Sequence, residues 1–385
     1  MRDIQPLFEA LAAEAFTKRR HSVRSATLPD AIILQSVKPD LEESISVVVV
    51  NYERCALLRA CLASLAAQRD VEFEVIVVDN GSRDGSAGMV EREFVPRRTP
   101  QVTLIRNSGN RGFCAANNQG FSAARGRFVA VLNNDAEAEP GWLSALVSAF
   151  RGRPRVGMAA SKILVHEDPR RIDKVGHLIY PDGQNRGRGS GEIDNGQYDR
   201  LEEALWPDGC AAMYRREMLE EIGGFDEDFF AYADDADLGL RGRIAGWSCL
   251  YVPAAVVRHH RGSTLGVGSG RRVELIERNR ILLAVKLFPA SLLWLNPWYY
   301  AVRVAAGLWA GIRNRGETRR FPGMRGKLLL GASVIKGCLS ALPLLPKMLR
   351  KRRELRRLRK LTPGQVRALI QEYRIPLKTL MEQAT

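Results

Sequence analysis

The sequence SVVVVNY, residues 46–52, is a run of four valines that ends in two polar residues. Similar apolar runs follow at 74–78, 102–105 and 127–132, and helical stretches separate them. Continuous apolar runs are typical of strands buried on both faces, and their alternation with helices is typical of parallel sheets. The sequence therefore predicts an α/β fold, with a mostly parallel, Rossmann-like sheet and helices on both faces.

The organisation of the chain follows from where this alternation begins and ends. Residues 1–44 should form one helix and a polar linker. A catalytic domain is expected over 45–272, with one half at 45–135 and the other at 136–272. Residues 273–385 should form a helical, basic, amphipathic extension.

The formal net charge of +15 is concentrated in one segment. Residues 313–360 hold sixteen Lys and Arg against two Glu, so the rest of the chain is nearly neutral. Such a segment suits the phosphates of a nucleic acid or the headgroups of an anionic membrane. Because carboxylates end several strands of the predicted sheet, a nucleic-acid groove on the catalytic domain is the weaker alternative.

Aromatic residues precede the basic segment and favour a membrane surface. They are Trp294, Trp298, Tyr299, Tyr300 and Trp309. The longest uncharged stretch there, 287–302, is shorter than the roughly 20 apolar residues needed to span a bilayer. Two prolines, Pro289 and Pro297, should also break its helix. We therefore expect an interfacial or re-entrant segment; the alternative is a soluble helical subdomain that forms a homodimer interface.

The cysteines and the N-terminus both favour a cytoplasmic location. The six cysteines are scattered, with no Cys-x-x-Cys pair, which is typical of reduced thiols. Asp3, Glu9 and Glu14 lie where a secretory signal would have a basic flank and an apolar run. A protein bound peripherally to the inner face of the cytoplasmic membrane fits these observations.

Polar residues follow the predicted strands at 51–52, 79–86 and 133–135. Ligands of open α/β sheets bind beyond the carboxyl ends of the strands, so these residues are candidates for a site. A carboxylate at Asp79 can accept the imide hydrogen of uracil or thymine, and glycine at Gly81 allows close approach. Such sequences are also ordinary turns and helix caps. Their order along the sheet is what indicates a nucleotide site.

A second acidic cluster lies at 234–237, where three aspartates fall within four residues. Aspartates favour helix N-termini, which explains one or two of them. Three carboxylates this close repel one another unless they share a cation or one of them has a raised pKa. A raised pKa is useful for proton transfer, so this cluster is a candidate catalytic site.

These blocks, taken in order, resemble glycosyltransferase family 2. They lie at 46–52, 77–82, 110–113, 132–135, 223–226 and 234–238. The likeness covers 45–279, and within the family the chain is most similar to bacterial rhamnosyltransferases that act on lipid-linked glycans. The resemblance implies the GT-A fold, transfer from a nucleotide-diphospho-sugar with inversion, and a divalent metal, Mg²⁺ or Mn²⁺.

The resemblance also implies roles for single residues. Asp235 would be the general base, with Asp234 as the second candidate, while Asp135 and His259 would bind the metal. Asp79 would hold the base of the nucleotide. The full set of expected nucleotide contacts is Asn51, Tyr52, Asp79, Gly81, Ser82, Asn110, Gly112 and Asn134. Acceptor or phosphate contacts are expected from Asp237, Arg261 and Arg278.

Two positions depart from the family pattern. Many members have Asp-x-Asp where this chain has Asn133 and Asp135, so metal binding would depend on one carboxylate. The usual Glu-Asp pair is here Asp234 and Asp235, whose first acid is shorter. A glycine-rich loop, 183–191, is a candidate lid that would close over the donor.

The function predicted from these residues is transfer of L-rhamnose from dTDP-rhamnose to a glycan or a polyprenyl-diphosphate-linked acceptor in cell-envelope polysaccharide synthesis. The alternative is a hexosyl- or galactofuranosyltransferase that uses a UDP-sugar. A nucleotidyltransferase is a weaker alternative, because residues 51–54 provide no glycine-rich phosphate loop after the first strand.

Overall fold

The computed structural model describes residues 43–97, 99–260, 269–312 and 319–382. The helix predicted near the N-terminus therefore lies outside the described residues.

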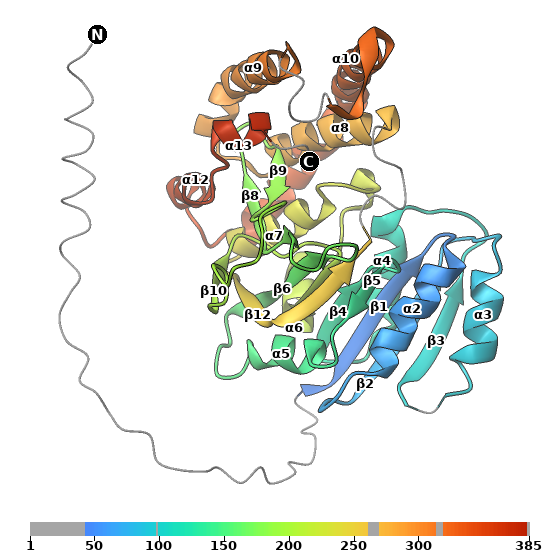
Figure 1. Cartoon of the computed structure of the whole chain (residues 1–385). Coiled ribbons are helices and arrows are strands. Elements are labelled where there is room, and N and C mark those ends of the chain that lie inside the picture. The colour runs from blue at the N-terminus through green and yellow to red at the C-terminus, as the bar shows by residue number, and fades with distance from the viewer. Residues whose placement is uncertain (1–42, 98, 261–268, 313–318, 383–385) are drawn as a thin grey trace. The chain divides into compact units, whose positions relative to one another are not determined.

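Four parallel strands form one half of the main sheet (Figure 1). They are β1 (Ile45–Asn51), β2 (Phe73–Asp79), β3 (Gln101–Arg106) and β4 (Phe128–Leu132). Their spatial order is β4-β1-β2-β3, and each neighbouring pair is parallel. All four apolar runs thus form strands, and their polar ends meet at one edge of the sheet.

The other half of the sheet is mixed. Strand β11 (Ala211–Arg215) is antiparallel to β4 and to β6 (Val156–Val165), and β12 (Ser248–His259) runs parallel to β6. Three short strands join this half: β5 (Ala136–Ala138), β7 (Ile172–Lys174) and β10 (Glu202–Ala204). A separate hairpin pairs β8 (His177–Ile179) with β9 (Asn185–Gly187).

Helices cover both faces of the sheet, as the apolar strands require. Val48 points into one core, which includes side chains of α4 (Phe113–Ala123), α6 (Arg216–Ile222) and α7 (Asp234–Ile244). Val47 and Val49 point into the other, with α2 (Cys55–Ala66), α3 (Ser86–Glu93) and α5 (Trp142–Ser148). Each buried valine stabilises the fold by about 1.5–3 kcal/mol. The predicted α/β architecture is confirmed.

The C-terminal part is helical, as predicted. It consists of α8 (Gly270–Leu287), α9 (Ala290–Ile312), α10 (Gly323–Ala341), α11 (Leu345–Glu354), α12 (Pro363–Glu372) and α13 (Leu377–Glu382). Helix α8 is the link to the sheet, because Leu282 and Leu283 are buried in the core that contains α7. Helices α10 and α11 both pack on α8, and α13 packs on α9.

The prediction that Pro297 breaks the helix is wrong. Proline lies inside α9, which runs through it for 23 residues. Pro297 lies inside this helix, about two turns from its first residue, where it removes one backbone hydrogen bond while the turns on either side stay helical. Pro289, in contrast, directly precedes α9.

Large apolar side chains are exposed on α9 and α10. Trp294 is 86% exposed and Trp298 is 67% exposed, and α10 exposes Leu328, Ile335 and Leu339. Among the described residues, one helical segment, Gly323–Arg357, is long and apolar enough to cross a membrane by length and composition. The sequence-based expectation considered only 287–302 and missed this segment.

Candidate active site

Asp234 and Asp235 lie in the first turn of α7. Both side chains face a pocket of about 400 Å³ between the sheet, the β8–β9 hairpin and α8. Asp235 accepts a hydrogen bond from its neighbour's backbone, Ala236 N, at 2.7 Å. The helix N-terminus favours negative charge here, but it provides few donors for two adjacent carboxylates.

The loop before α7 holds an unusual backbone. Phe230, Tyr232 and Ala233 all have positive φ, between 57° and 69°. Non-glycine residues in this region cost about 1–3 kcal/mol each, so surrounding contacts must hold them. Asn279 of α8 provides these contacts, because its buried amide donates to the carbonyls of Phe229, Ala231 and Tyr232 at 2.7–2.9 Å. Helix α8 thus fixes the position of the two aspartates.

The two aspartates interact electrostatically. Burial raises the pKa of Asp234 well above its ordinary value, and the adjacent Asp235 raises it further. Burial also raises the pKa of Asp235, although His177 opposes the shift. Adjacent carboxyls of this kind retain a proton to higher pH than ordinary aspartates. The pair is therefore a stronger proton acceptor than ordinary aspartates.

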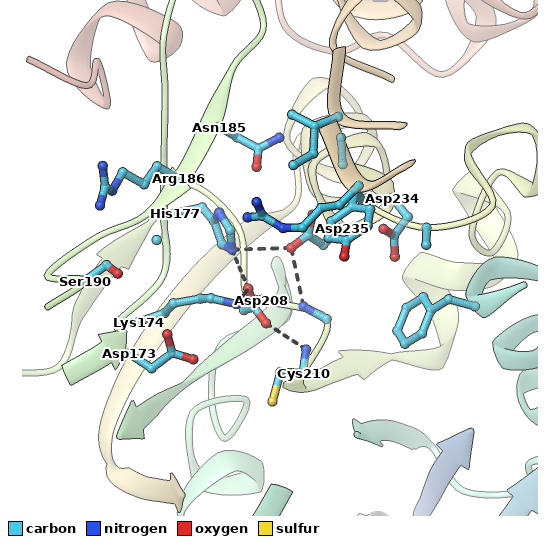
Figure 2. Close-up of a pocket in the computed structure, with 18 of the residues that line it drawn as sticks. Asp173, Lys174, His177, Asn185, Arg186, Ser190, Asp208, Cys210, Asp234 and Asp235 are labelled. Atoms are coloured by element: carbon cyan, nitrogen blue, oxygen red, sulfur yellow. Dashed lines mark hydrogen bonds and ion pairs between the residues drawn. The ribbon is translucent and has the colours of Figure 1, made fainter. Parts of the chain in front are cut away.

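A histidine and a third aspartate contact this pair (Figure 2). His177 Nε2 lies 2.7 Å from Asp208 Oδ2 and 3.3 Å from Asp235 Oδ2. Lys174 Nζ lies 2.7 Å from the same oxygen of Asp208. Burial would raise the pKa of Asp208, but Lys174 and His177 lower it well below its ordinary value. Asp208 is therefore a carboxylate at neutral pH.

Asp135 and His259, the predicted metal ligands, lie together in the same pocket. His259 Nε2 is 3.4 Å from Asp135 Oδ1, and its Nδ1 is 2.8 Å from Asp173 Oδ2. Burial lowers the pKa of His259, but Cys210, Asp135 and Asp173 outweigh it and raise the pKa. A carboxylate behind a histidine is the usual arrangement that orients an imidazole toward a metal. The residues fit a divalent cation, since they offer one carboxylate and one oriented imidazole.

The pocket combines both sets. It is lined by acidic residues from β7, α7 and the segments that follow β4 and β10, and by basic residues from β7, β9, α8 and the segment before α10. The acidic residues are Asp135, Asp173, Asp208, Asp234 and Asp235; the basic ones are Lys174, Arg186, Arg272, Arg280 and Arg320. The glycine-rich loop lies here as well: β9 and its flanking residues form one wall, and Gln184, Arg186 and Ser190 are buried.

The predicted nucleotide residues lie outside the pocket, along the ends of β1, β2 and β4. Asn51 donates from Nδ2 to Asp79 Oδ1 and to Ser82 Oγ, both at 3.0 Å. Its Oδ1 accepts from Asn134 Nδ2 at 2.7 Å. We call these four residues the strand-end network. Because Asn134 lies between the pocket residues Asn133 and Asp135, the network and the pocket meet at the end of β4.

Two glycines allow the loops beside this network to approach closely. Gly81 has φ +83°, and a Cβ there would lie 2.6 Å from the backbone of Gly109. Gly112 has φ +85°, and a Cβ there would lie 2.5 Å from the ring of Phe230. Asn110 Oδ1 accepts from Gly112 N at 2.9 Å. Tyr52 is 40% exposed next to Asn51 and is free to contact a ligand.

Asp237 and Arg278 do not face the pocket. Asp237 is fully buried between Arg241 at 2.8 Å and Lys286 at 2.6 Å, so its charge is already neutralised within the core. Arg278 donates to the carbonyls of Asp228 and Phe229 and so supports the loop before α7. These geometries correct the predicted acceptor or phosphate contacts of both residues. Arg261 lies outside the described residues.

Several pocket residues were not predicted from the sequence, among them Asp173, Lys174, His177 and Asp208. They lie in the loosely patterned segment after 136, where short strands give no clear alternation. The local sequence signal for a site here was weak. It consisted of two charged residues in a short strand, Asp173 and Lys174, followed by His177. Their convergence on α7 depends on tertiary contacts that no spacing encodes.

Known proteins similar to this chain include glycosyltransferases. Residues 46–223 match the model of glycosyl transferase family 2. A relative from Mycobacterium tuberculosis, N-acetylglucosaminyl-diphospho-decaprenol L-rhamnosyltransferase, is 26% identical over 76% of this chain and 99% of its own length. An uncharacterized protein of the same species, MT1568, is 30% identical over 73% of this chain and 85% of its own length.

A solved structure shares the fold. The crystal structure of GalNAc-T7 with UDP, GalNAc and Mn²⁺ superposes with a TM-score of 0.56 at 16% identity, over 68% of this chain. The match spans half of the GalNAc-T7 chain. At this identity the likeness concerns the fold, which is GT-A. The chain belongs to glycosyltransferase family 2.

Proposed function

We propose that this glycosyltransferase is metal-dependent and inverting, and that it transfers L-rhamnose from dTDP-rhamnose to a lipid-linked glycan acceptor. The observation that carries the proposal is the pocket in which Asp235 and Asp135 lie together beside the strand-end network. A base for the acceptor and a cation ligand for the donor diphosphate are the two groups that such a transfer requires.

The strand-end network supports a pyrimidine nucleotide. Asp79 is buried, and its two oxygens each accept one hydrogen bond, from Asn51 Nδ2 and Ser82 N. A carboxylate has about four acceptor positions, so Asp79 can accept a further hydrogen from the imide of thymine or uracil. The rhamnosyl relative favours dTDP-rhamnose as the donor. A UDP-hexose or UDP-galactofuranose is the alternative.

The mechanism we propose is a single displacement. Asp235 removes the proton of the acceptor hydroxyl while that oxygen attacks the anomeric carbon. The bond between this carbon and the diphosphate oxygen breaks, dTDP leaves from the opposite face, and the configuration inverts. Burial, together with the nearby carboxylate of Asp208, raises the pKa of Asp235 and makes it a stronger base. A divalent cation, Mg²⁺ or Mn²⁺, held by Asp135 and His259 would neutralise charge on the diphosphate.

The acceptor side of the pocket faces the C-terminal helices. Arg272 and Ile276 of α8 line it, together with Arg320, which precedes α10 by a few residues. Guanidinium groups suit phosphate oxygens, so this wall can bind the diphosphate of a polyprenyl-linked acceptor. The exposed apolar residues of α9 and α10 then lie on the side from which a lipid would enter.

We also propose that these helices bind an anionic membrane at its cytoplasmic face. Exposed tryptophans on α9 and a basic segment in and after α11 are the features of an interfacial anchor. An interface between two copies of the chain is the alternative use of the same surface. Flotation with vesicles of phosphatidylcholine, with and without phosphatidylglycerol, tests this proposal. Binding only to the anionic vesicles supports it, whereas a dimeric protein that binds neither kind of vesicle overturns it.

Isothermal titration with dTDP and UDP, each with and without Mg²⁺ or Mn²⁺, tests the donor. Metal-dependent binding of dTDP in preference to UDP is expected. A preference for UDP would move the proposal to the alternative donor. Absence of binding to either, combined with salt-sensitive binding of DNA, would instead favour a nucleic-acid function for the basic segment.

A further inference from the structure

His177 occupies a buried position between two carboxylates, as Figure 2 shows. Its side chain is 6% exposed, and the ring stacks on Trp206 with centroids 5.9 Å apart. Nε2 is the nitrogen that faces both Asp208 and Asp235, at 2.7 Å and 3.3 Å. Nδ1 has no hydrogen-bond partner among the described residues. All of the polar contacts of this histidine are therefore made by one nitrogen.

Asp208 fixes which nitrogen carries the proton. Its Oδ1 accepts from Cys210 N at 2.8 Å, and its Oδ2 accepts from Lys174 Nζ at 2.7 Å. Asp208 therefore stays ionised and can only accept from His177. Because the nitrogen that faces an anionic acceptor must be a donor, the imidazole carries its proton on Nε2.

We propose that His177 is a positioning residue for the general base, and that its Nε2–H, held by Asp208 and with Nε2 3.3 Å from Asp235 Oδ2, stabilises the charged form of Asp235. This inference rests on the proposed function, in which Asp235 takes the acceptor proton. A donor at this oxygen stabilises the carboxylate over the carboxylic acid. Asp235 Oδ1 accepts one hydrogen bond, from Ala236 N, and keeps a second acceptor position for the acceptor hydroxyl. His177 therefore extends the pH range in which Asp235 is a base.

A second metal ion at His177, Asp208 and Asp235 is the competing use of this cluster, because one atom of each lies within 4.8 Å of the others. Lys174 argues against it. Its ammonium group already contacts Asp208 Oδ2 at 2.7 Å. Burial alone would lower the pKa of Lys174, but the negative charge of Asp208 outweighs burial and raises this pKa. The position of a second cation next to Asp208 is thus filled by a lysine of the chain itself.

Other charged groups face the same space and must be held constant in a test. They are Asp234 from α7, Lys174 from β7, Arg186 from β9, and Arg272 and Arg280 from α8. Substitutions of His177 alone leave all of these in place. Two amides form a matched pair: His177→Gln can place its amide nitrogen near the position of Nε2, whereas the shorter His177→Asn reaches only the position of Nδ1.

The experiment is the pH profile of kcat/KM for sugar transfer by wild type, H177Q and H177N. We expect H177N to move the acidic limb upward by about one pH unit, to lose up to about 10-fold on that limb, and to recover at high pH. H177Q should stay within about threefold of wild type, because it keeps the donor. Binding of dTDP should be the same in all three proteins.

Several results would overturn the inference. Equal, pH-independent losses in H177Q and H177N would mean that the ring only packs against Trp206. Unchanged profiles in both would mean that Asp235 does not need the donor. Loss of one of two bound Mn²⁺ ions in both variants would assign the cluster to a metal. If wild type shows no transfer, or D235N remains active, the proposed function has failed instead; thermal melts establish that each variant is folded.

Discussion

Four aspartates of one segment, Asp226, Asp234, Asp235 and Asp237, have opposite surroundings, although three of them are buried and Asp235 is mostly buried. Asp226 and Asp237 both contact Lys286 Nζ at 2.6 Å, and Asp226 also pairs with Lys351. Asp234 and Asp235 pair with no lysine or arginine among the described residues. Burial opposes ionisation of Asp226, but its two lysines lower its pKa, whereas burial raises the pKa of Asp234. Cations of α8 and α11 therefore separate structural acids from candidate catalytic ones.

The largest expected effect comes from replacing Asp235, which lines the pocket and has no lysine or arginine partner among the described residues. Asp235→Asn should reduce kcat by about 10²–10⁴-fold, because a general base contributes about that much. The amide keeps the shape of the side chain and cannot take the proton. Steady-state transfer assays measure this effect.

Titration of D235N with dTDP is the control. Nucleotide binding should survive, since the strand-end network lies at the ends of β1, β2 and β4 and not on α7. Loss of both binding and transfer would remove the base assignment and would favour a role for Asp235 in holding the donor.

On the structural side, Lys286→Met should destabilise the fold by about 3–5 kcal/mol, because it leaves two buried carboxylates without their shared cation. Denaturant melts measure this change. Since the folded pKa of Asp226 is lowered, its contribution is present above the unfolded value of about 4 and is lost as pH falls below it. The gap between wild type and K286M should therefore narrow at acidic pH; a constant gap would show that packing dominates.

Much of the fold could be predicted from the sequence because each buried parallel strand is a continuous apolar run. The valine run before Asn51 and the other apolar runs gave the parallel half of the sheet, and their polar ends located the strand-end network. The resemblance to family 2 suggested Asp135 and His259 together, and the structure places them 3.4 Å apart. Local pattern and motif order were enough for these features.

The rest depended on contacts between distant segments. Nothing near Asp237 in the sequence indicates that Lys286 will neutralise it, so three similar aspartates could not be separated. The short strand that carries Lys174 and the loop that carries Asp208 have no periodicity to predict their meeting. At Pro297 a local rule gave a wrong prediction: proline favours a break in the helix, but α9 continues through this residue.

Asp234→Asn tests the same contrast, between aspartates with and without a partner cation, and its expected effect on folding stability is smaller than that of K286M. Removing a buried carboxyl that has no partner lysine or arginine among the described residues should stabilise the fold at neutral pH, because burial and Asp235 raise the pKa of Asp234. Because the folded pKa of Asp234 is raised, its favourable contribution exists below the unfolded value of about 4 and is lost as pH rises through the folded value. The gain of D234N should therefore appear only as pH rises. Melts at pH 4 and pH 8 measure it, and destabilisation at pH 8 would contradict the contrast.

The smallest effect is expected at the exposed end of the same ion network. Lys347 Nζ lies 2.6 Å from Asp228 Oδ1, but the lysine side chain is 44% exposed and Asp228 also pairs with Lys351. Lys347→Met should cost under about 1 kcal/mol, and 1 M NaCl should remove most of that difference. K286M, whose partners are buried, should respond little to the same salt. If both variants lose the same folding free energy and depend equally on salt, burial does not set the strength of these ion pairs. The difference between structural and catalytic acids would then need another cause.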